Sequence, residues 1–159
     1  MFRAEIAKGS DLGKRVESIL AAGELVPDET TIEMIRSRLA QRDAASGFVL
    51  DGFPRNMAQA DALDEMLSEI GKPLTIVFEL QVPDEVARAR MAKRAAEEGR
   101  VDDTPEVIDR RIAIYHEETA PIVQHYRMVG NLVGIHGTKS VDEVFAEIQE
   151  GLEHAAVRS

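Results

Sequence analysis

The chain has 159 residues, a length that fits one domain and is sufficient to bury a hydrophobic core. Hydrophobic residues make up 44% and charged residues 30%, and we find neither an apolar run of roughly 18 residues, as a membrane span needs, nor a signal-peptide segment. The absence of cysteine excludes a disulfide framework and a cysteine zinc site. A formal net charge of −10 argues against a general nucleic-acid or anionic-membrane surface, and we expect a cytoplasmic protein.

The first half of the chain is predicted to be mainly helical. Apolar residues recur every three or four positions, with breaks at Gly9 and Gly23, and predict helices at residues 2–8, 12–22, 28–40 and 58–70. Between the last two helices, the short apolar run at residues 47–51 predicts a strand that is buried on both faces.

The second half alternates strands and helices. Strands are predicted at residues 74–82 and 132–136, and helices at 85–97, at 105–129 and from Ser140 onward. Thr104 and Pro105 are typical of a helix start, Pro121 predicts a kink, and Ser140 with Glu143 forms a capping box. This alternation predicts an α/β fold with a parallel sheet that binds its ligands at the carboxyl ends of the strands.

The stretch FVLDGFPR, residues 48–55, carries the first chemical signal. Asp51 ends the apolar run, like the Walker B carboxylate that holds Mg²⁺ directly or through water. Taken alone, this pattern is more often a simple turn after a strand. The following residues favour a ligand site, because Gly52 lets the backbone approach a ligand, and Arg55 and Gln59 share one face of the next helix. Those two side chains could hold a phosphate and a base edge.

Arginines are concentrated between residues 88 and 111, which hold seven of the 19 Lys and Arg residues, six of them Arg. A guanidinium grips phosphate oxygens with two hydrogen bonds and stays charged, so the cluster indicates an anion site; a solvated helix face with ion pairs is the alternative. Arg90 and Arg94 lie on one helix face, Arg100 follows a loop and Arg111 comes from the next helix, so four guanidiniums could converge on one polyphosphate.

The segment DGFPRNMAQA closely resembles the signature of the adenylate kinases, within the nucleoside-monophosphate kinases. The resemblance covers nearly the whole chain and includes, in the family's order, MFRAEIAKGSDLG, GELVPDE, VPDE, GRVDDTPEVIDRRIAIYHEETAPI and HGTKSVDEV. It implies a P-loop-type parallel sheet flanked by helices, with an AMP-binding region at 1–26, core at 27–94, a lid at 95–103, and core with the C-terminal helix at 104–159. Only five residues separate Arg94 from Arg100, which resembles the short-lid type without a structural metal.

The activity implied by the resemblance is reversible phosphoryl transfer from Mg-ATP to AMP, giving two ADP. Mg²⁺ is then the cofactor, the nucleotides ATP, AMP and ADP are the partners, and a monomer is expected. A UMP/CMP kinase shares DGFPRN, although GELVPDE and Gln59 favour AMP. The third reading is a non-catalytic AMP-binding protein on the same scaffold.

The resemblance assigns roles to individual residues. On the AMP side, Arg3 and Arg55 match phosphate-binding arginines; the adenine and ribose are implied to contact Leu20, the backbone of Glu24 and Val26, Gln59 and the Gly52 backbone. Asp51 matches the carboxylate of the Mg²⁺ water shell. On the ATP side the matches are Arg90, Arg94, Arg100 and Arg111, an acidic lid residue at Asp103, and Lys139, whose backbone contacts the adenine. Arg88, Arg110 and the four histidines receive no role in the site.

The family's Gly-rich GxxxxGK[ST] loop has no counterpart in the sequence. The nearest candidate, GSDLGK at residues 9–14, has the wrong spacing and follows no predicted strand. By comparison with the family, about thirty residues are missing: one strand–loop–helix unit, whose strand is the centre of the sheet, and a short second strand. We consider a truncated N-terminus, a segment supplied by another chain, and a non-catalytic protein as explanations.

Overall fold

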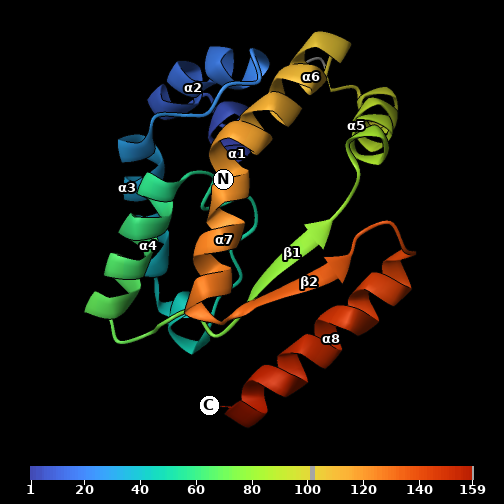
Figure 1. Cartoon of the computed structure of the whole chain (residues 1–159). Helices are drawn as coiled ribbons and strands as arrows, with labels where there is room; N and C mark the ends of the chain where they lie inside the picture. The colour runs from blue at the N-terminus through green and yellow to red at the C-terminus, as the bar shows by residue number, and fades with distance from the viewer. Residues whose placement is uncertain (101–102, 159) are drawn as a thin grey trace. The chain divides into compact units, whose positions relative to one another are not determined.

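The computed structural model describes residues 1–100 and 103–158 (Figure 1). The chain forms two compact units. The first contains Met1–Asp51 and Arg88–His116, and the second contains Gly52–Ala87 and the chain from Glu117 onward. The backbone therefore passes from one unit to the other at residues 51–52, 87–88 and 116–117.

The first unit is helical. Its elements are α1 (Phe2–Ala7), α2 (Asp11–Ala21), α3 (Asp28–Leu39), the 3₁₀ turn Arg42–Ser46, most of α5 (Asp84–Glu98) and α6 (Pro105–Ile114). Side-chain caps fix two helix starts: Ser10 Oγ accepts from the Gly13 N–H at 3.0 Å, and Thr104 Oγ1 accepts from the Val107 N–H at 3.4 Å. The buried apolar residues of this unit include Val16, Val26, Ile35, Ala44, Ile108 and Ile114.

The second unit contains the sheet. Its elements are α4 (Met57–Glu69), β1 (Val77–Gln81), α7 (Ala120–Val129), β2 (Leu132–His136) and α8 (Val141–Arg158). The two strands are parallel, in a register that pairs Val77 with Leu132 and Gln81 with His136, and both α7 and α8 pack against β2 (Figure 1). Ala60, Ile122 and Tyr126 form a buried cluster, covered by Met57, Leu74, Val77 and Leu132.

The predicted α/β class and the parallel sheet are confirmed, and β2 has the predicted bounds. The predicted strand at residues 47–51 is wrong: no strand is assigned there, and Val49 is 93% exposed. The reason is that an extended segment becomes a strand only through hydrogen bonds to a neighbouring strand. Within the described residues the sheet consists of β1 and β2 alone, so this apolar run has no ladder to join.

The predicted long helix from 105 to 129 is interrupted close to Pro121, where the sequence predicted a kink. A π-helical turn, Tyr115–Thr119, separates α6 from α7, and Pro121 lies in the first turn of α7. Proline has no N–H to donate to the carbonyl four residues earlier, and a wider turn before it accommodates that loss.

Two further searches cover only the described residues. No helix in residues 1–100 and 103–158 is both long and apolar enough to cross a membrane. In that same part of the chain, no group of three or more His, Asp or Glu side chains is arranged to hold a metal ion.

Candidate active site

The DGFPR motif forms a tight turn that positions Arg55. Gly52 has a φ of +71°, a conformation that favours glycine, and a Cβ placed on it would lie 3.0 Å from Arg55 Nη2. The guanidinium folds back over the turn, because Arg55 Nε donates to the Gly52 carbonyl oxygen at 2.8 Å. The sequence therefore needs glycine at this point to let the arginine side chain lie against the backbone.

Two amide side chains brace the same turn. Asn56 caps α4, accepting the Gln59 N–H at 2.9 Å, and Gln59 Oε1 accepts the Arg55 N–H at 2.8 Å. Gln59 is only 2% exposed, and Thr119 Oγ1 donates to the Arg55 carbonyl oxygen at 2.6 Å. Hydrogen bonds from α4 and from the π-helical turn thus fix both main-chain polar groups of Arg55.

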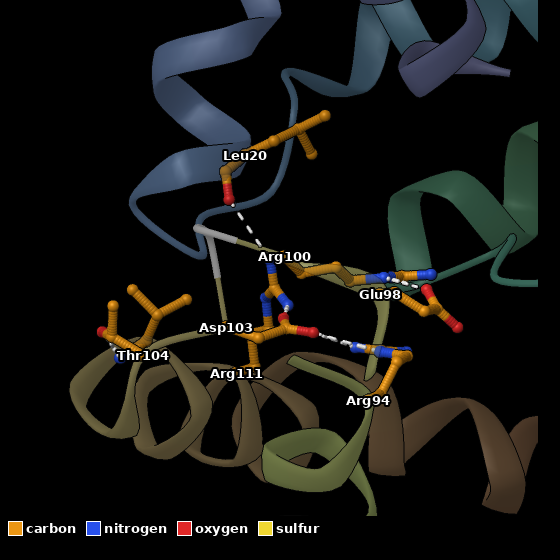
Figure 2. Close-up of polar contacts among 8 residues, drawn as sticks. Leu20, Arg94, Glu98, Arg100, Asp103, Thr104 and Arg111 are labelled. Carbon is orange, nitrogen blue, oxygen red and sulfur yellow. Dashed lines mark hydrogen bonds and ion pairs between the residues drawn. The ribbon is translucent and has the colours of Figure 1, made fainter. Parts of the chain in front are cut away.

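A buried carboxylate holds two of the predicted phosphate-binding arginines in the first unit (Figure 2). Arg94 donates to Asp103 Oδ2 from Nε at 3.1 Å and from Nη2 at 2.7 Å, while Arg111 Nη1 donates to Asp103 Oδ1. The Asp103 side chain has no exposed surface, whereas the side chains of Arg94 and Arg111 are 36% and 22% exposed. Asp103 therefore fixes two guanidiniums that still reach the surface.

Arg111 also contacts the predicted AMP-binding region. Its Nη2 donates to the Leu20 carbonyl oxygen, near the end of α2, at 3.2 Å (Figure 2). The neighbouring Arg110 forms a two-bonded ion pair with Glu24, at 2.9 and 3.2 Å. One turn of α6 is thereby joined to the end of α2 and to the segment that follows it.

The other two arginines of the predicted cluster are Arg100 and Arg90. Arg100 Nε donates to Glu98 Oε2 at 2.6 Å (Figure 2). Arg90 is exposed on α5. Arg88, for which no role was predicted, pairs with Asp109 at 2.9 Å on the surface. Asp103 thus brings together Arg94 and Arg111, which belong to the four predicted guanidiniums. Of the predicted lid, residues 101 and 102 lie outside the described residues.

The other residues predicted for AMP and Mg²⁺ differ in exposure. Arg3 is exposed on α1, and Val26 is 5% exposed in the core of the first unit. Asp51 is exposed, and its carboxylate is a hard oxygen donor of the kind Mg²⁺ prefers. A single carboxylate fits Mg²⁺ when the nucleotide phosphates and water supply the other ligands, which is the usual arrangement for this ion.

Lys139 lies in the loop between β2 and α8. Its side chain and that of Glu147, on α8, form a hydrogen bond, and Glu147 also accepts a hydrogen bond from His136. Glu147 Oε1 accepts from Lys139 Nζ at 2.6 Å, and Oε2 accepts from the His136 N–H at 2.8 Å. His136 Nδ1 lies 3.0 Å from Glu147 Oε1. The hydrogen bonds from Lys139 first, and then from the His136 backbone, lower the pKa of Glu147 to about 2.

The sequence predicted neither Glu147 nor Thr119 as a part of these arrangements. A signal for Glu147 existed, because it lies four residues after the capping-box residue Glu143 and so shares its helix face. No comparable signal existed for Thr119, whose contact with Arg55 joins positions 64 residues apart.

Comparison with known proteins agrees with these observations. A family model described as adenylate kinase matches residues 1–131. An adenylate kinase of Stenotrophomonas maltophilia (strain R551-3) is 47% identical over 148 residues, covering 93% of this chain and 79% of the relative. One of Xanthomonas campestris pv. campestris (strain B100) is 46% identical over 152 residues, covering 96% and 81%. One of Parvibaculum lavamentivorans is 47% identical over 152 residues, covering 94% and 74%. The chain therefore belongs to the adenylate kinase family of nucleoside-monophosphate kinases.

Proposed function

We propose that this protein catalyses the reversible transfer of the γ-phosphoryl group from Mg-ATP to AMP, giving two ADP. The observation that carries the proposal is the buried Asp103 that holds Arg94 and Arg111, in a chain of the adenylate kinase family. Two positive groups with fixed orientation and partly exposed side chains suit a polyphosphate ligand.

The chemistry needs positioning and charge neutralisation more than a covalent contribution from the protein. An AMP phosphate oxygen attacks the γ-phosphorus of ATP, the bond from that phosphorus to the β,γ-bridging oxygen breaks, and ADP leaves. No side chain has to remove a proton, because the attacking phosphate oxygen is already ionised. Arg90, Arg94, Arg100 and Arg111 are the groups that we assign to the charge on the transferred phosphoryl group.

The AMP acceptor is assigned to a second set of residues. Arg3 and Arg55 are proposed to bind the AMP phosphate. The adenine and ribose are assigned to Leu20, the main chain of Glu24 and Val26, the Gly52 main chain and Gln59. The fixed main chain of Arg55 supports its assignment, because an arginine on an ordered turn loses less conformational entropy when it binds a phosphate.

Mg²⁺ is the cofactor that the family implies, and Asp51 is the residue that we assign to it. When bound, the ion would neutralise charge on the ATP phosphates and orient them. The exposed carboxylate would hold it through a water molecule. We expect the protein to act as a monomer in the cytoplasm.

The deciding experiment is a coupled assay of ADP formation from ATP and AMP. It compares the 159-residue chain with an extended chain, in which a strand–GxxxxGK[ST]–helix unit from an adenylate kinase relative precedes Met1. This comparison is informative because the printed sequence contains no such loop to cradle the ATP phosphates. Turnover in either form supports the proposal. Binding of AMP without turnover in both forms would favour the non-catalytic alternative and contradict the kinase proposal.

The acceptor base is tested in the same assay. AMP is replaced by UMP or CMP at equal concentration, and we expect AMP to give the highest kcat/KM. A preference for UMP or CMP would identify the chain as a pyrimidine-nucleotide kinase, the alternative that shares the DGFPRN motif.

A further inference from the structure

The loop His136–Ser140 lies at the edge of the sheet where the strands end. His136 is the last residue of β2 and pairs in register with Gln81, the last residue of β1. The Gly137 N–H donates to the Gln81 carbonyl oxygen at 3.1 Å, and a Cβ on Gly137 would lie 2.5 Å from Val82 Cγ2. The loop is thus packed onto the carboxyl ends of both strands, the edge where parallel α/β proteins bind ligands.

Glu147, on α8, contacts two residues of this loop, His136 and Lys139. Its carboxylate accepts the His136 N–H at 2.8 Å and the Lys139 ammonium at 2.6 Å, and it lies 3.0 Å from the His136 imidazole. The Glu147 side chain is 21% exposed, so these donors cover most of it. One carboxylate therefore ties the residue that ends β2 to a residue three positions later.

The capping box at the start of α8 holds Ser140, whereas Glu147 holds His136 and Lys139. Glu143 Oε2 accepts the Ser140 N–H at 3.0 Å and the Ser140 hydroxyl at 2.6 Å, contacts that fix the first residue before the helix. His136 and Lys139 are held by Glu147. The Lys139 ammonium is bonded to Glu147, and the Lys139 N–H donates to the His136 carbonyl oxygen at 3.1 Å. The main-chain carbonyl is therefore the group that this residue can offer to a nucleotide base.

We propose that Glu147 is a positioning residue for the donor nucleotide. It holds the loop His136–Ser140 in the shape in which the Lys139 main chain contacts the adenine of ATP, an inference that rests on the proposed function. Removing the charged acceptor frees the loop and weakens ATP binding, while the AMP side, which is assigned to other segments of the chain, is unaffected.

The test compares Glu147→Gln with Glu150→Gln, which removes a charge from an exposed position on the same helix. Amide hydrogen exchange of the 159-residue chain reports on the loop itself. KM for ATP and for AMP is measured in whichever form of the chain the coupled assay shows to be active. We expect faster exchange at residues 136–140 and an ATP KM raised by about three- to tenfold in Glu147→Gln, with the AMP KM within about twofold of the parent. Glu147→Asp, which keeps the charge, is expected to recover part of the ATP affinity.

The inference alone would be overturned by an ATP KM in Glu147→Gln equal to that of Glu150→Gln, or by unchanged exchange at residues 136–140. An equal rise in the KM of both nucleotides would also overturn it, because general destabilisation would then explain the effect. Absence of nucleotide binding and turnover in the parent protein would instead overturn the proposed function, and this inference with it.

Discussion

Asp103 shows how much one residue can determine at this site. Its carboxylate has no exposed surface and accepts hydrogen bonds from Arg94 and Arg111, which come from different helices. Removing one member of such a group leaves the remaining charges without compensation, which costs more than loss of an exposed pair. The sequence predicted an acidic lid residue and the two arginines, but their pairing depends on how α5 and α6 pack.

Replacing Asp103 with Asn tests this arrangement. We expect kcat of the active form to fall by about 10- to 100-fold, because the amide cannot hold both guanidiniums in their present orientation. Steady-state ADP formation measures the effect. Asp109→Asn is the control, since Asp109 pairs with Arg88 on the surface and should change kcat by less than about twofold. A full rate in Asp103→Asn would show that the arginines need no such support.

Arg55 is the residue whose loss should be most damaging on the AMP side. We expect Arg55→Ala to lower kcat/KM for AMP by about two orders of magnitude or more, because it removes the guanidinium that we assign to the AMP phosphate. The control is Arg42→Ala, an exposed arginine in the 3₁₀ turn. An unaffected rate in Arg55→Ala would remove this residue from the proposed site.

Among the secondary-structure elements, local signals predicted the helices well and the sheet less well. The capping residues Thr104 and Ser140 and the apolar periodicity act within a few residues, so the sequence alone reveals them. Residues 47–51 have the composition of a buried strand, but composition does not show whether a neighbouring strand exists. The π-helical turn was not predicted as such, although Pro121 marked its position.

The start of α4 offers a test at this scale. Asn56→Ala removes the acceptor of the Gln59 N–H, and we expect the free energy of unfolding to fall by about 1 kcal/mol. Urea denaturation followed by circular dichroism measures this change. Asn56→Asp keeps an acceptor at the same position and should retain most of the stability. Equal losses in both variants would show that the cap is not what Asn56 contributes.

For the whole molecule, the net charge of −10 is accompanied by carboxylates that local donors stabilise in their charged form. Hydrogen bonds lower the pKa of Glu5 through Lys8, of Asp43 through Arg38, and of Glu143 through Ser140. With Glu147, these groups make the folded chain release protons more readily than the unfolded chain. Stability should therefore decline as the solution is acidified.

For Glu147, the pH range over which this stability is lost can be stated. Folding lowers its pKa from 4.5 to about 2, so its contribution to stability is complete above about pH 4.5 and is lost as the pH falls toward 2. We expect Glu147→Gln to lower Tm relative to the parent at about pH 6, and this difference to shrink steadily below about pH 4. Thermal melts across this range measure it. A Tm difference that stays constant with pH would show that the charge of Glu147 does not contribute.

The π-helical turn Tyr115–Thr119 limits which insertions and deletions the chain tolerates. Each residue advances a helix by about 100°, so an insertion or deletion between Thr119, where the turn ends, and the packed residues of α7 would turn the Thr119 side chain by that angle. The Thr119 hydroxyl would then no longer meet the Arg55 carbonyl oxygen. Substitutions within the turn, where Tyr115 is 42% exposed, leave that phase intact. We therefore expect related sequences to vary less in the length of this segment than in its residue types.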